Sequence, residues 1–231
     1  MVKYNYNQLA CAPECKNNSI VWTESPMLEE RRLLRLCLNR DGEKTVTVIM
    51  MNPSKANSEH SDKTVNQLID FFFNQPISVE NESSRKVANI KYLDIVNLFS
   101  AYNPNSSHLY KNINQLVSQK TYGFFTELIK LNNTTIRDSI KDSDYIVLAW
   151  GDCPDKFNEI LYYNQVVKTI KSITSYGRKE AYTFKIYNKR QDKILSITKK
   201  GNPVHVINAI NGDIQCLIKV ELDEYKGVVP V

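Results

Sequence analysis

The sequence predicts one three-layer α/β/α domain, in which a central, mostly parallel sheet of four core strands lies between helices and carries antiparallel strands at its edges. Four continuous apolar runs support this, because such runs are typical of strands buried on both faces of a parallel sheet. They occupy residues 45–51, 92–96, 145–149 and 194–198. Segments with helical spacing lie between these runs, and alternating strands and helices indicate the α/β class.

Antiparallel strands are expected beside the parallel ones. Residues 32–38, the pair Asp41–Gly42 and the run from Thr45 together predict a β-hairpin, because Asp-Gly readily adopts the positive φ of a tight turn. Residues 182–187 and 216–222 are candidates for further edge strands.

Three helices are predicted from apolar spacing and capping residues. The first follows Ser61 or Asp62, either of which can cap it. The second covers about residues 113–129, with an interruption near Gly123. The third begins at Pro154, since proline is favoured at the first helical position.

The chain of 231 residues is expected to form a single domain, because no repeat or linker divides it. Residues 1–30 are polar and predict an irregular N-terminal arm packed on that domain. No run reaches the roughly 18 apolar residues that a membrane span requires, and no secretory signal is visible. We therefore expect a cytoplasmic protein without a membrane partner.

The five cysteines are scattered and do not predict a cofactor or a metal site. Cys37 and Cys216 lie in apolar runs and are expected to be buried small side chains. Cys11 and Cys15 form a Cys-x3-Cys pair, but no second pair of ligands stands at a comparable spacing. The sequence leaves the role of Cys11 and Cys15 open.

Positive charge is concentrated near the end of the chain. The segment from Arg178 to Lys200 contains eight basic and two acidic residues. Its net charge is therefore +6, compared with +5 for the whole chain. Such a run is usually a solvated face, but it directly precedes the segment Gly201–His205. The alternative is therefore contact with a polyanion, such as a nucleic-acid backbone.

Polar residues at the ends of the apolar runs are the candidate site. Asn52, Asn97 and Asp152 each follow a run, and His205 comes soon after the last one. In open α/β sheets the ligand crevice lies outside the carboxyl ends of the strands. These residues are therefore expected to meet in one shared site.

The chemistry of these residues limits what each can do. Asn52 in Asn52-Pro53-Ser54 can orient water or a substrate, but its amide cannot take a proton at neutral pH. Asn97 needs partners if it is buried, and a ligand is one of them. His205 can act in proton transfer or hydrogen bonding. The competing interpretations are a turn asparagine, a capping asparagine and a structural histidine.

Several enzyme classes are excluded by the absence of their motifs. The chain has no phosphate-binding Gly-x-x-x-x-Gly-Lys loop and no Gly-x-Gly-x-x-Gly fingerprint. It also lacks His-Glu-x-x-His and Gly-x-Ser-x-Gly. An ATPase, a dinucleotide oxidoreductase, a zinc protease and a serine hydrolase are therefore not expected.

A set of short motifs resembles a bacterial and phage family known as domain of unknown function 1643. The motifs occur in family order over most of the chain, and they are Arg32-Leu-Leu-Arg35, Ile49-Met-Met-Asn-Pro-Ser-Lys-Ala56, Asp62-Lys-Thr64, Val96-Asn-Leu-Phe99, Ala149-Trp-Gly151 and Thr198-Lys-Lys-Gly-Asn-Pro-Val-His205.

The same pattern is more distantly similar to the uracil-DNA glycosylase superfamily, and this resemblance implies a uracil-DNA glycosylase-like fold. It implies that Asn52 positions the hydrolytic water and that His205 stabilises the departing base anion. It further implies that the base is read by Asn97, with Ser54 and Trp150 beside it. The DNA backbone would be held by the basic residues Lys55, Arg190, Lys199 and Lys200.

The function expected from these observations is DNA binding with hydrolysis of the N-glycosidic bond of a flipped base. The alternative is a non-catalytic module that binds nucleic acid, or a protein partner, through a degenerate pocket. A third alternative is an enzyme acting on free nucleosides or nucleotides. The sequence does not specify the base, the strandedness of the DNA or the oligomeric state.

Overall fold

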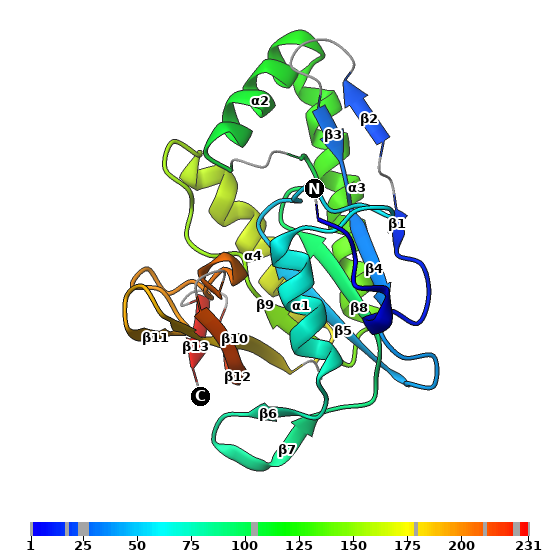
Figure 1. Cartoon of the computed structure of the whole chain (residues 1–231). Helices are drawn as coiled ribbons and strands as arrows, with labels where there is room; N and C mark the ends of the chain where they lie inside the picture. The colour runs from blue at the N-terminus through cyan, green and yellow to red at the C-terminus, as the bar shows by residue number, and fades with distance from the viewer. Residues whose placement is uncertain are drawn as a thin grey trace.

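The computed structural model describes residues 2–16, 19–22, 28–102, 106–177, 180–209, 212–223 and 227–230. Within them, a mixed sheet has a parallel centre (Figure 1). The parallel strands follow the spatial order β8 (Ile90–Asn97), β5 (Lys44–Met50), β9 (Tyr145–Leu148) and β10 (Ala181–Asn188). The predicted α/β class, with a parallel core and antiparallel strands beside it, is confirmed.

Other strands extend the sheet on both sides of this centre. On one side, β4 (Leu33–Cys37) pairs with β8, and β1 (Glu14–Lys16) pairs with β4. On the other side, β12 (Gly212–Asp223) pairs with β10. Short strands complete this side, namely β6 (Ile77–Val79), β7 (Glu82–Val87), β11 (Lys193–Leu195) and β13 (Gly227–Pro230). A separate ribbon consists of β2 (Ser19–Trp22) and β3 (Leu28–Glu30).

Helices cover both faces of the sheet. Helix α1 (Lys63–Phe73) packs on one face, and α3 (Tyr122–Asp142) and α4 (Glu159–Ser175) pack on the other (Figure 1). Helix α2 (Ser106–Gln119) contacts α3. Side chains of a strand alternate between faces, so Val48 and Met50 belong to the apolar cluster of α1, whereas Ile49 belongs to that of α3 and α4.

The fourth parallel strand is not the one that the sequence indicated. Residues 194–198 contribute only to β11, a three-residue antiparallel strand against β10, and Ile194 is exposed. The predicted edge segment 182–187 instead lies in β10, inside the sheet. Strand β10 carries polar side chains that have partners inside the protein. Thr183 Oγ1 donates to the carbonyl of Leu148, and Lys185 pairs with Glu80. These bonds satisfy groups that would otherwise oppose burial.

The predicted hairpin was wrong in its pairing, although β4 is an antiparallel neighbour of the parallel strands. Strand β4 pairs with β8, and β8 separates it from β5. Gly42 therefore does not serve a two-strand turn. A Cβ atom at Gly42 would lie 2.7 Å from the backbone nitrogen of Lys91, so the glycine allows the chain to pass close to the start of β8.

Helices are present in all three predicted regions, but only the start of α1 agrees with a predicted residue, since α2 and α3 together extend beyond the predicted residues 113–129 at both ends. Asp62 caps α1 by accepting a hydrogen bond from the Val65 nitrogen at 2.9 Å. The predicted interruption near Gly123 corresponds to the break between α2 and α3, where Thr121 caps α3. Helix α4 begins at Glu159 rather than at Pro154, because Lys156 has a positive φ of 65° that a helix does not accommodate.

The N-terminal residues are more regular than predicted. They contain the 3₁₀ turn η1 (Tyr6–Gln8) and the strands β1 to β3. Tyr4 is buried in the core, and its hydroxyl donates to the carbonyl of Asn57 at 2.7 Å. Burial raises the pKa of the Cys37 thiol to about 11, and the neighbouring Cys11 thiol adds to this effect. Cys11 therefore lies beside Cys37, whereas Cys15 lies in β1.

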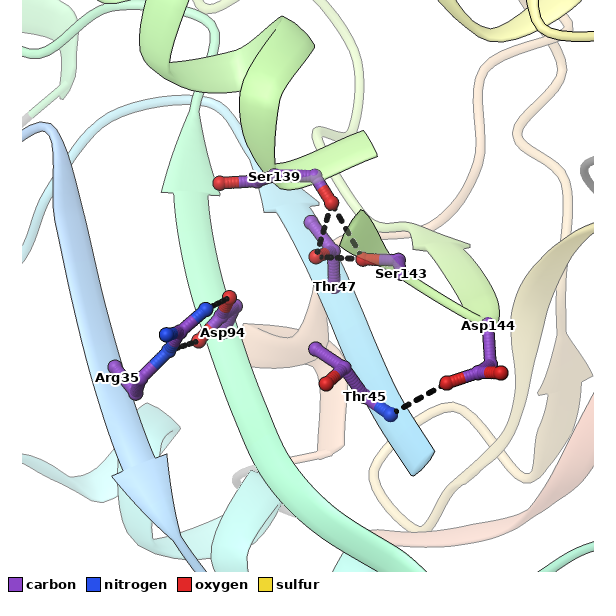
Figure 2. Close-up of polar contacts among 7 residues, drawn as sticks. All are labelled: Arg35, Thr45, Thr47, Asp94, Ser139, Ser143 and Asp144. Carbon is purple, nitrogen blue, oxygen red and sulfur yellow. Dashed lines mark hydrogen bonds and ion pairs between the residues drawn. The ribbon is translucent and has the colours of Figure 1, made fainter. Parts of the chain in front are cut away.

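A row of polar side chains crosses the sheet on the face that α3 covers (Figure 2). The Arg35 guanidinium donates two hydrogen bonds, of 2.8 and 2.7 Å, to the buried carboxylate of Asp94, and these bonds raise the pKa of Arg35. Thr47 stands beside Asp94 in the sheet and bonds with Ser143. The row continues to the carbonyl of Ser139, which accepts from the Ser143 hydroxyl at 2.6 Å.

Candidate functional site

A cavity of about 720 Å³ lies at the carboxyl ends of β5 and β9. The segment after β10, from Lys193 to Asn208, supplies much of its wall, including residues near the 3₁₀ turn η2 (Val206–Ala209). The position agrees with the rule that open α/β sheets bind ligands beyond the carboxyl ends of their strands. Residues Asn52, Trp150, His205, Lys199 and Lys200, five of the residues singled out from the sequence, line this cavity.

Asp152 lines the cavity as well, whereas the remaining predicted site residues, Asn97, Ser54, Lys55 and Arg190, are not part of the cavity wall. Asn97 is fully buried at the end of β8. Ser54 donates to the carboxylate of Asp62, so its hydroxyl is used to hold the loop before α1. Lys55 is exposed on the same loop, and Arg190 is exposed in the turn between β10 and β11. The proposed roles of these residues remain predictions.

Asn52 is fixed where β5 leaves the sheet. Backbone hydrogen bonds continue past the strand, because the Leu98 nitrogen donates to the Met50 carbonyl and the Phe99 nitrogen donates to the Met51 carbonyl. The Asn52 amide then donates to the Pro53 carbonyl at 3.2 Å. This local geometry holds the Asn52 side chain at the cavity wall.

Arg31 is a residue of this region that sequence reasoning missed. Its side chain is only 2% exposed, and it donates from Nη1 to the Ala56 carbonyl in the loop after Asn52. Its Nε and Nη2 atoms have no hydrogen-bond partner among the described residues. Burial lowers the pKa of Arg31. Nothing in the local sequence separates Arg31 from the charged residues around it, so no signal marked it as buried.

His205 reaches the cavity because its loop packs against the end of β9. The Gly151 nitrogen donates to the Pro203 carbonyl at 2.9 Å. Gly151 has a φ of +75°, and a Cβ atom there would lie 3.1 Å from the His205 Cβ. Trp150-Gly151 therefore needs glycine both for its backbone conformation and for the close approach of the histidine.

The protonation state of His205 follows from its contacts. Nδ1 accepts a hydrogen bond from the Ile207 nitrogen at 3.0 Å, so the hydrogen of the neutral ring is on Nε2. Burial lowers the pKa of His205 to about 4, and Asp62 opposes this shift only in part. At neutral pH the ring is therefore an uncharged hydrogen-bond donor.

Asp152 ties the His205 loop to β9 and also lines the cavity. Its Oδ1 atom accepts from the Thr198 hydroxyl at 2.5 Å and from the Asn202 amide at 2.8 Å. The sequence indicated Asp152 as a candidate site residue because it follows the apolar run 145–149. The two bonds hold the Oδ1 atom in place.

Two buried polar groups near the strand ends lack partners. Both amide atoms of Asn97 have no hydrogen-bond partner among the described residues, and the same holds for Trp150 Nε1. Trp150 is only 1% exposed, so most of its ring is packed in the core rather than presented to the cavity. Asn97 pairs in register with Met50, two residues before Asn52.

The basic stretch is only partly available to a ligand. Lys185 and Lys189 form ion pairs with Glu80 and Asp213. Lys193, Lys199 and Lys200 are exposed and line the cavity, with Lys200 4.0 Å from an oxygen of the exposed Glu159. Arg178 and Lys179 lie outside the described residues.

The fold and this cavity define an α/β protein whose candidate ligand site is at the carboxyl ends of parallel strands. The chain belongs to the family described as Protein of unknown function (DUF1643), whose model matches residues 32–206. The match extends from the start of β4 to the loop of His205. Comparison with curated proteins and with solved structures gave no match.

No described helix combines the length and apolar character needed to cross a membrane. Histidine, cysteine and acidic side chains do not gather in groups of three or more that could hold a metal ion in this part of the chain.

Proposed function

We propose that this protein binds DNA and hydrolyses the N-glycosidic bond of a base that has been flipped into the cavity beside Asn52 and His205. The observation that carries the proposal is the neutral His205, whose Nε2 hydrogen is available as a donor in a cavity that Asn52 also lines. The resemblance of the motif order to that of uracil-DNA glycosylases supports the proposal. The volume of about 720 Å³ lies within the usual range of ligand pockets.

The physical requirements of the reaction match these groups. Negative charge develops on the departing base, and a fixed hydrogen-bond donor stabilises it more in the transition state than in the bound substrate. His205 would supply that donor, and Asn52 would hold the water that attacks the sugar. A flipped base loses its stacking, and cationic contacts with the DNA backbone help to offset that cost.

A second candidate is a binding module without catalysis, and one observation favours it. Asn97 is fully buried and Trp150 almost so, which leaves these two predicted base-reading residues little surface for a ligand. In this alternative, the cavity and its lysines would hold a nucleic acid or a protein partner, and no base would be released.

Neutralising Lys199 and Lys200 tests the DNA contact directly. The double substitution Lys199→Gln and Lys200→Gln is expected to weaken binding to all DNA sequences and to reduce the slope of log affinity against log salt by about 2. The expected reason is the loss of two phosphate contacts at the cavity rim. Fluorescence anisotropy with labelled oligonucleotides at several salt concentrations measures both quantities.

A matched control removes the same charge elsewhere. Lys130 and Lys141 are exposed on α3, so their replacement by glutamine should leave the affinity and its salt slope almost unchanged. Equal behaviour of the two double variants would contradict DNA contact at the cavity.

A further inference from the structure

We propose that Asp152 is the general base of the reaction, accepting the proton of the water that attacks the sugar. This inference rests on the proposed function. It assigns a catalytic role to a carboxylate that both the motif comparison and the sequence-based site left without one.

The cavity offers no other suitable proton acceptor among its described residues. Asp152 is the only carboxylate in its described wall. Asn52 carries a neutral amide, which does not take a proton at neutral pH. His205 has Nδ1 occupied by the Ile207 nitrogen and its hydrogen on Nε2, and the lysines are cations. Removal of a proton from water therefore falls to Asp152.

The contacts of Asp152 suit this role. Both of its hydrogen bonds end on Oδ1, from Thr198 and Asn202, while Oδ2 has no hydrogen-bond partner among the described residues. The backbone behind it is held as well, because the Tyr162 hydroxyl donates to the Gly151 carbonyl at 2.6 Å. One oxygen thus fixes the carboxylate and the other remains for a ligand proton. A positioned base of this kind contributes on the order of 10²–10⁴ to a rate.

The step balances with these groups alone. A bond forms between the water oxygen and the anomeric carbon, and the bond from that carbon to the base nitrogen breaks. The electron pair leaves with the base, whose charge is stabilised by His205. The water proton passes to Oδ2 of Asp152, and the base anion later takes up a proton from solvent. The products are the free base and an abasic sugar.

Asp152→Asn is the informative variant, because the asparagine oxygen can still accept from Thr198 and Asn202. Single-turnover base release from a uracil-containing oligonucleotide should fall about 10²–10⁴-fold. DNA affinity and the melting temperature should stay near those of the wild type.

Two further variants distinguish a catalytic role of Asp152 from a purely structural one. Asp152→Ala should be inactive, and added formate should restore part of its rate by supplying a carboxylate. Thr198→Val removes one of the two hydrogen bonds to Asp152 but keeps the carboxylate, so it should lose less of the rate than Asp152→Asn.

The outcomes distinguish the two levels of the proposal. If the wild type releases base but Asp152→Asn keeps the wild-type rate, the assignment of Asp152 is overturned and the proposed function stands. Loss of activity without formate rescue, together with weaker DNA binding or a lower melting temperature, would make Asp152 a structural brace. If the wild type releases no base from any oligonucleotide, the proposed function fails, and the role of Asp152 fails with it.

Discussion

Replacement of Asn52 by alanine is expected to lower base release by about 100-fold or more, while DNA affinity stays nearly unchanged. Water positioning contributes only on the way to the transition state, so its loss affects the rate rather than binding. Asn52 and His205 line the cavity together with Lys199 and Lys200, and the charge that is expected to hold the DNA backbone is on the lysines. Single-turnover assays and anisotropy measure the two effects separately.

The matched control for this variant is Asn164→Ala. Asn164 is exposed on α4, and its loss should change neither quantity. A parallel loss of binding and base release in Asn52→Ala would contradict the assigned role, because it would show that Asn52 contributes to binding or to folding. Far-UV circular dichroism distinguishes these two causes.

Replacement of Arg35 by leucine is expected to lower the free energy of unfolding by about 3–5 kcal/mol. The Asp94 side chain is only 1% exposed, and Arg35 donates both of the hydrogen bonds described for its carboxylate (Figure 2). Without Arg35 a buried negative charge would remain without its counter-charge, which costs far more than a surface ion pair. Urea unfolding monitored by tryptophan fluorescence measures the difference in the free energy of unfolding between the variant and the wild type.

Two further variants make this prediction specific. Lys44 forms an exposed ion pair with Asp144 at 3.0 Å, so Lys44→Met should have a much smaller effect than Arg35→Leu. The double variant Arg35→Leu with Asp94→Leu should recover much of the lost stability, since no unpaired charge remains. Equal effects of Arg35→Leu and Lys44→Met would show that the buried pair does not contribute as described.

Local signals in the sequence predicted much of the fold. The cap at Asp62 and the apolar spacing after it predicted α1, and long apolar runs predicted β5, β8 and β9. The order in which the strands pair was harder to predict, because it depends on contacts between residues that are distant in the sequence. The Asp41–Gly42 turn indicated a hairpin, whereas the glycine is needed where the backbone passes the start of β8.

The missed central strand illustrates the same limit. Strand β10, which the sequence predicted only as a candidate edge strand, carries the polar residues Thr183 and Lys185. Their partners are the Leu148 carbonyl and Glu80, both remote in sequence. A polar residue can occupy a central strand when such partners exist, and a single sequence does not display them.

The sequence predicted that Asn52 and His205 share a site, but the reason given for His205 differs from what the structure shows. Asn52 and His205 do line one cavity. However, His205 does not follow a parallel core strand. Its loop is held against β9 by Asp152 and Gly151. The burial of Arg31 had no local signal, because it depends on packing against the loop that contains Ala56.

The most direct test of the central claim uses the wild-type protein. It is incubated with single- and double-stranded oligonucleotides that carry uracil or a modified pyrimidine, and alkaline treatment then cleaves any abasic site. We predict strand cleavage at the position of one such base, with the free base released into solution. Salt-dependent DNA binding without cleavage of any substrate would contradict base excision and favour the binding module, and cleavage of free nucleosides without DNA affinity would contradict the DNA assignment.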